Sequence, residues 1–516
     1  MNHPQSNHRR RSFLKSASAA SITLSLAEFS FLGRLPSVSA AESQLPTTAV
    51  QFSEDIEPLV RLLEDTPRQK VIETFAEKIL SGTSYRQVLA ALLLAGVRNV
   101  QPRPSVGFKF HAVLVVNSAH LASQSAPPSD RWLPIFWALD YFKSSQARDQ
   151  QEGDWTMSAV DQSKLPPPHQ AKQAFREAME SWDVEAADVA IVSLCQSASA
   201  TEVFDLLAHY GCRDYRSIGH KSIYVANAYR TLQCIGWRYA EPVLRSLAYA
   251  ILNHHGEPNP STSDLGPDAA WRMTQQTLPQ LDKGWKFGRV DSGATLSLLD
   301  TLRSATPSDA VEATAEMLSS GIAPQSIIDA LYLSSGEMLG QQPGIVTLHS
   351  ATTTNAMQYA FRTAYRDRTR QELLLQNAAF IPYFRQSMQG REKVAAQTIN
   401  LGSSESSDQA SGDATDTSVD KLFQTVSENR GKASAAMLGY LDSGAPPEAL
   451  IDAARRLVFL KGNDSHDYKF SSAVLEDYYA VSPDFRNAFL ASSAYLLPGS
   501  QDKNNGLVDR VREAIL

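Results

Sequence analysis

Three histidines in this chain stand in similar short contexts, each near the start of a predicted helix. They are His111, His220 and His349. Imidazole is the side chain best suited to metal ligation and to proton transfer near neutral pH. An asparagine follows each histidine after six or seven residues, at Asn117, Asn227 and Asn355. If the three segments pack alike, their imidazoles meet, and we expect either a metal site or a general acid and base there.

A hydroxyl accompanies the third histidine. Thr352 follows His349 by one helical turn, so its hydroxyl is predicted to orient the imidazole or a substrate carbonyl. The alternative is that the three histidines share a structural role, such as capping the preceding turn. Single buried histidines commonly bond a backbone carbonyl or a hydroxyl in this way.

The elements that must position these residues are helices. Apolar residues recur at spacings of three and four, as in Val71, Phe75 and Ile79, while strict alternation is scarce. The sequence therefore predicts an all-α fold.

A repeat lies upstream of the histidines, where a small residue precedes an aliphatic one by six positions. The small residues are Gly82, Ser197, Gly321 and Gly444. This pattern predicts about four irregular two-helix units that stack into a solenoid or close into an α-α ring, since one such unit cannot bury its apolar face alone.

The fourth unit contains His466, and the sequence leaves open whether this residue belongs to the repeated set. Aligning Lys469-Phe470 with Lys109-Phe110 places Ser471, rather than His466, opposite His111.

The first forty residues resemble a twin-arginine export signal. Arg10-Arg11 precedes Phe13-Leu14-Lys15, a mildly apolar stretch follows, and Val38-Ser39-Ala40 ends the segment. The resemblance predicts a signal peptide at residues 1–40, recognition by the twin-arginine export machinery, and a periplasmic or otherwise exported protein. The alternative is a basic, disordered arm.

The rest of the chain, residues 41–516, is predicted to form a single helical-repeat domain. A run of Ser, Asp, Gly and Thr predicts a disordered loop at residues 400–417. The apolar stretch near the N-terminus is too short and too weak for a stable membrane span.

Composition excludes several classes of protein. A formal net charge of -7 and a pI near 5.9 argue against a nucleic-acid partner, which normally requires a basic face. Three cysteines, at positions 195, 212 and 234, form an odd set that excludes a disulfide scaffold and leaves one pair or none. A zinc site from His209, Cys212, His220 and Cys234 is the weaker alternative because only the first two are close in sequence.

The histidine segments resemble the motifs of a known family. His111-Ala112-Val113-Leu114, His220-Lys221-Ser222-Ile223 and Leu348-His349-Ser350-Ala351-Thr352 look like the three His-bearing motifs of questin oxidase-like proteins. These are helical enzymes that insert oxygen beside a quinone carbonyl, using NADPH and dioxygen. The resemblance implies a His-lined cavity, a small aromatic or quinone-like substrate, and NADPH as a cofactor.

The chain departs from this pattern at Tyr224, Asn355 and Met357, where relatives have Arg, His and Leu. Free NADPH is not available outside the cytoplasm, so an exported relative needs another reductant or a different chemistry.

Three functions follow from these observations. The first is an exported oxidoreductase in which His111, His220, His349 and Thr352 act on a small-molecule substrate, with the three histidines as the candidate ligands of a bound metal. The second is a non-catalytic helical repeat protein that binds an envelope partner, and the third is a His-ligated, metal-dependent hydrolase.

Overall fold

The computed structural model describes residues 34–39, 56–102, 106–252, 258–260, 262–391, 393–402 and 418–516. Within these ranges the chain is helical, and its one β-type pairing is an isolated bridge between Arg289 and Ile322. The all-α prediction is therefore confirmed. The division into four equivalent repeat units stays a prediction.

Helices cover most of the described chain. Their bounds are α2 (Glu57–Asp65), α3 (Val71–Leu80), α4 (Tyr85–Asn99), α5 (His111–Ser125), α6 (Leu133–Glu152), α7 (Ala171–Ser181), α8 (Val184–Ser197), α9 (Ala200–Gly211), α10 (His220–Ile235), α11 (Ala240–Ile251), α12 (Gly266–Thr277), α13 (Ser292–Leu302), α14 (Pro307–Ser319), α15 (Pro324–Gln341), α16 (Ile345–Thr363), α17 (Asp367–Gln389), α18 (Val419–Glu428), α19 (Arg430–Asp442), α20 (Pro447–Lys461), α21 (Ser465–Asp477), α22 (Pro483–Ser492) and α23 (Leu507–Ile515).

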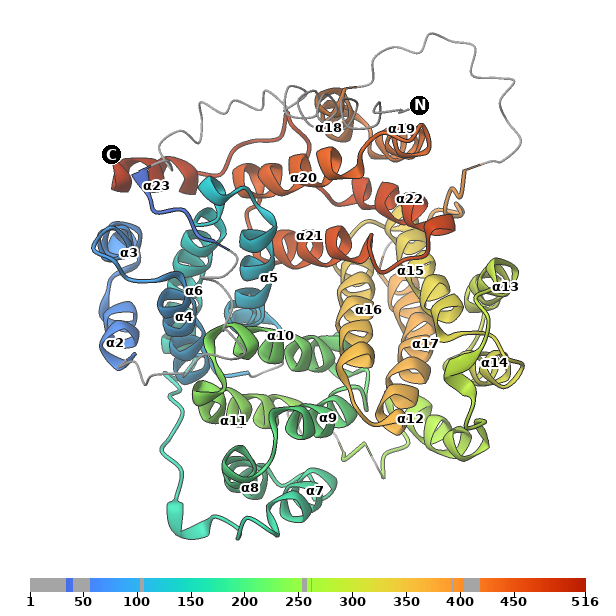
Figure 1. Ribbon diagram of the computed structural model, residues 1–516, viewed down its shortest axis with the longest axis horizontal. Helices are drawn as coiled ribbons and strands as arrows, with labels where there is room; N and C mark the ends of the chain where they lie inside the picture. Colours follow the sequence, from blue (N-terminus) through green and yellow to red (C-terminus); the bar gives the residue numbers. More distant parts are fainter. Residues whose placement is uncertain are drawn as a thin grey trace, which may run out of the picture.

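Four of these helices form a closed inner ring around the middle of the molecule (Figure 1). Helix α5 packs on α10, α10 on α16, α16 on α21, and α21 returns to α5. Each inner helix is backed by outer ones, such as α6 behind α5, α11 behind α10, α17 behind α16 and α20 behind α21. The three histidines of the sequence pattern lie on three members of this inner ring.

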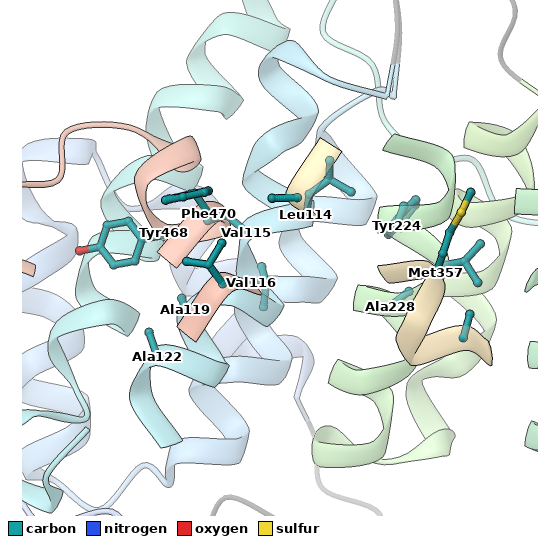
Figure 2. Packing of buried hydrophobic residues seen from close by; sticks show 14 of the residues in the cluster. Leu114, Val115, Val116, Ala119, Ala122, Tyr224, Ala228, Met357, Tyr468 and Phe470 are labelled. Carbon is teal, nitrogen blue, oxygen red and sulfur yellow. The ribbon is translucent and has the colours of Figure 1, made fainter. Parts of the chain in front are cut away.

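Apolar side chains hold the inner ring together. Figure 2 shows Leu114 of α5, Tyr224 of α10, Met357 of α16 and Phe470 of α21 among the buried residues of this region. All four side chains are at most 2 % exposed. Burial of such side chains stabilises a fold by about 1.5–3 kcal/mol each, so the ring is anchored from all four helices.

Local capping fixes where the fourth inner helix begins. The Asp464 side chain accepts from the backbone of α21 and Asp467 accepts in return from the backbone N–H of Asp464, which is a complete capping box. The same device starts α4, where Ser84 and Gln87 cap each other. The cap sets Ser465 as the first residue of α21.

The predicted signal peptide, residues 1–40, lies outside the described residues except for 34–39. Those six pack on the helical body, since Val38 is buried and Trp132 Nε1 donates to the Pro36 carbonyl at 3.1 Å. Most of the predicted loop at 400–417 also lies outside the described residues. No helix in the described ranges is both long enough and apolar enough to cross a bilayer.

Candidate metal centre

The three predicted histidines meet at one buried point. Nε2 of His220 lies 2.9 Å from Nε2 of His111 and 2.9 Å from Nε2 of His349. All three candidate ligand nitrogens lie within 4.8 Å of one another, and each residue is at most 6 % exposed. The structure therefore brings together residues that are more than one hundred positions apart in the chain.

Unusual backbone conformations precede two of these histidines. His220 is the first residue of α10 and follows Ser217, Ile218 and Gly219, whose φ angles are 59°, 46° and 81°. His111 is the first residue of α5 and follows a turn in which Phe108 has a φ of 52°. Non-glycine residues in the left-handed region store strain and concentrate at functional sites.

Buried ion pairs hold the turn before His220 in this shape. Lys221 Nζ lies 2.9 Å from an Asp214 carboxylate oxygen, and both side chains are fully buried. Arg216 pairs with Asp268 at 2.5 Å, again within the interior. Because removing one partner of such a pair leaves an uncompensated buried charge, the pairs fix the turn strongly.

Gly219 provides a test of this turn. A Cβ at Gly219 would lie 2.1 Å from Oγ1 of Thr353, whereas a Cβ at Gly321, which has nearly the same φ of +82°, would meet nothing within 4 Å. We expect G321A to lower the free energy of unfolding by about 1 kcal/mol through backbone strain alone. We expect G219A to lower it by at least about 2 kcal/mol, because overpacking adds to the strain.

Urea unfolding of both variants measures the difference. The G219A variant should also weaken metal binding by displacing His220, while G321A should not. Equal losses of stability in the two variants would contradict the steric argument.

Hydrogen bonds fix the tautomers of two imidazoles. Nδ1 of His220 lies 2.6 Å from the Ser217 carbonyl oxygen, and Nδ1 of His349 lies 2.6 Å from that of Ile345. A carbonyl oxygen only accepts, so Nδ1 carries the hydrogen in both rings. The Nε2 atoms of the neutral rings therefore present lone pairs to the centre, as metal-binding imidazoles do.

The three imidazoles are held neutral. Burial lowers the pKa of His111, His220 and His349 well below the ordinary value, and the positive charge of Lys469 acts in the same direction. Neutral imidazole is the form that ligates metals.

Lys469 of α21 completes the inner wall of the site, and the sequence did not predict it. Its Nζ lies 3.3 Å from Nε2 of His220 and 3.4 Å from Nε2 of His349. Burial lowers the pKa of this amine to about 7. Lys469 is the fifth residue of α21, and His349 is the fifth residue of α16. The two side chains therefore occupy the same position in their helices.

His466 lies beside the three histidines. Its ring centre is 4.6 Å from that of His111 and 5.3 Å from that of His349. Nδ1 lies 3.3 Å from an Asp464 oxygen, while Nε2 is buried without a hydrogen-bond partner. The question that the sequence left open is thus answered in part, since His466 borders the centre from α21.

The short contacts cannot all be hydrogen bonds among neutral rings. Nε2 of His220 and Nε2 of His349 each have a lone pair and no hydrogen, yet they lie 2.9 Å apart. Two lone pairs at this distance repel each other unless a positive charge is shared between them. Burial and Lys469 oppose protonation of either ring, whereas a metal ion binds both nitrogens. Two nitrogens about 2.1 Å from one ion are about 3.0 Å apart at the right angle of square-planar or octahedral coordination, and about 3.4 Å apart at the tetrahedral angle.

The other sequence-predicted residues fall in different places. Thr352 is buried next to the centre, but its hydroxyl donates to the His349 carbonyl at 3.4 Å instead of contacting the imidazole. The alternative zinc set does not form among the described residues, because His209 binds Glu372 at 2.7 Å while His220 lies in the centre. None of the three cysteines takes part in a disulfide bond in the structure.

Comparisons of the chain with protein-family models, with curated proteins and with solved structures found no match. The class of protein is therefore defined by what the structure itself contains. It is an all-α protein with a buried centre of three imidazole nitrogens and a lysine amine.

Proposed function

We propose that this protein is a metal-dependent oxidoreductase whose metal ion is bound by Nε2 of His111, His220 and His349. The observation that carries the proposal is the 2.9 Å contact between the lone-pair nitrogens of His220 and His349. Of the two cofactors considered from the sequence, NADPH and a His-bound metal, the metal is the one that this geometry supports.

The donor set narrows the choice of metal. Three neutral imidazoles suit zinc, copper, iron or nickel, whereas magnesium and calcium prefer oxygen ligands. Lys469 contacts two of the three rings, and Asp464, whose charge acts on Lys469, contacts His466 instead of the three rings.

The redox assignment and the substrate class rest on the resemblance to questin oxidase-like proteins. We propose a small aromatic or quinone-like substrate, with His466 or Lys469 available to hold or move a proton at the metal centre. Export through the twin-arginine machinery to the periplasm is likewise a proposal that rests on the N-terminal sequence.

A purely structural role fits the site less well. A helical repeat protein that binds an envelope partner would present its functional residues on an open concave surface. Here the inner ring closes, and the imidazoles face one another in the interior.

Metal titration of the purified full-length protein tests the proposal. After removal of bound metal with a chelator, we expect one Co²⁺, Cu²⁺, Zn²⁺ or Fe²⁺ ion to bind per chain, with visible Co²⁺ absorption typical of nitrogen ligands. Oxygen uptake should then appear with a phenol or hydroxyquinone panel in the iron-loaded or copper-loaded form and vanish on chelation. A protein that binds no ion stoichiometrically contradicts the metal centre, and a loaded protein without oxygen uptake contradicts the redox assignment.

A further inference from the structure

A small polar chamber borders the imidazole centre on the side of the three asparagines. All four inner helices line it, and its volume is about 10 Å³. The polar residues that line it are Asn117, Ser118, Asn227, Thr352, Asn355, Lys469 and Ser472. A space of this size holds about one water molecule.

The chamber carries groups that require a polar occupant. Asn117 donates from Nδ2 to Oδ1 of Asn227 at 3.2 Å, and Asn227 donates in turn to the Leu114 carbonyl at 2.9 Å. Oδ1 of Asn117 is left buried with no hydrogen-bond partner. Buried polar atoms of this kind are normally satisfied by a protein group or by water.

Lys469 connects the chamber with the metal ligands. It lines the chamber, and its Nζ lies within 3.4 Å of Nε2 in both His220 and His349. A molecule in the chamber is therefore one side chain away from the imidazole nitrogens.

A surface pocket adjoins the chamber. This pocket, of about 150 Å³, shares two lining residues with the chamber, Leu121 and Ser472, both of which are half-buried. Ser472 Oγ donates to the Ser118 carbonyl at 2.8 Å. Glu476 lines the surface pocket and accepts from Nδ2 of Asn355, which lines the chamber, at 3.0 Å.

We propose that this chamber is the passage by which a neutral ligand the size of water or dioxygen reaches the metal, with Leu121 and Ser472 as its outer gate. This proposal rests on the proposed metal centre and adds that only small ligands reach the metal. An aromatic ring does not fit a chamber of about 10 Å³. A larger substrate therefore stays in the surface pocket, while the small ligand passes between α5 and α21.

Nitric oxide, a neutral diatomic molecule, tests the passage in the Co²⁺-loaded protein. We expect stopped-flow absorbance to show association at least about 10-fold slower in L121W, which fills the gate, and severalfold faster in L121A. The matched control is S125W, because Ser125 lines the surface pocket without lining the chamber. Imidazole, which is a ring, should not bind to the metal in the wild type.

The outcomes separate the two proposals. Co²⁺ loading is measured first, and its failure contradicts the metal centre alone. In that case isocyanic acid tests the passage without metal. The neutral amine of Lys469 adds across the C=N bond of isocyanic acid and forms a urea, and mass spectrometry measures the rate of this labelling. Equal rates of nitric oxide association, or of Lys469 labelling, in wild type, L121A and L121W would contradict the proposed passage. Rapid binding of imidazole to the loaded metal would contradict it as well.

Discussion

Replacing His220 with alanine should abolish stoichiometric metal binding. His220 is the central member of the three histidines, because its Nε2 lies 2.9 Å from the Nε2 of both others. Its removal takes away one ligand and the contact that joins the remaining two. Changes in groups that merely support a ligand weaken metal affinity 10- to 100-fold, so loss of this ligand should cost at least about 100-fold.

His120 supplies the matched control for this experiment. It lies on α5 together with His111, it is also buried, and its Nδ1 is bound to the Tyr85 hydroxyl at 2.9 Å, away from the centre. We expect H120A to lose stability while still binding one ion with unchanged affinity. Isothermal titration and metal analysis of the two variants decide the question, and an H220A protein with wild-type affinity would exclude the proposed ligand set.

Acidification should destabilise the metal-free protein steeply. Burial lowers the pKa of His120 to about 4, against an ordinary value of 6.5. Since the unfolded chain binds the proton more readily, the free energy of unfolding falls as the pH drops from 6.5 to 4. This one residue accounts for about 3 kcal/mol over that interval.

The three histidines of the centre act with the same sign, because their pKa values are also lowered by burial. With four protons taken up on unfolding, the free energy of unfolding should fall by up to about 5 kcal/mol per pH unit. Urea unfolding in the presence of a chelator, repeated between pH 7 and pH 4, measures the slope.

The variant H120Q isolates one of these protons. Above pH 6.5 the difference in free energy of unfolding between the variant and the wild type should be constant. Between pH 6.5 and pH 4 this difference should shift by about 3 kcal/mol in favour of the variant. A difference that does not change with pH would show that His120 is protonated equally in the folded and unfolded chains.

Local sequence patterns predicted much of this protein. The spacing of apolar residues identified the all-α class, because the residues on the buried face of a helix recur every three or four positions whatever the helix packs against. The common context of His111, His220 and His349 identified three residues that the structure places in one centre. Resemblance between segments was informative here because the three histidines lie near the starts of three helices that belong to the same ring.

The sequence made no prediction for Lys469 and left the place of His466 open. Aligning Lys469-Phe470 with Lys109-Phe110 placed Ser471 opposite His111, whereas in the structure Lys109 pairs with Asp149 at 2.7 Å and Lys469 contacts the imidazoles. The relevant similarity is the position within the helix, where Lys469 corresponds to His349. That position becomes known only when the capping box at Asp464 has fixed the start of α21.

The sequence by itself determined which residue types are available for chemistry and that helices carry them. Tertiary structure decided which nitrogen of each ring faces the centre, that Lys469 joins it, and that the asparagines line a chamber beside it. The physical reason is distance along the chain. Hydrogen bonds and apolar spacing within a helix depend on near neighbours, whereas the contact between His111 and His220 spans 109 residues and exists because the four inner helices close into a ring.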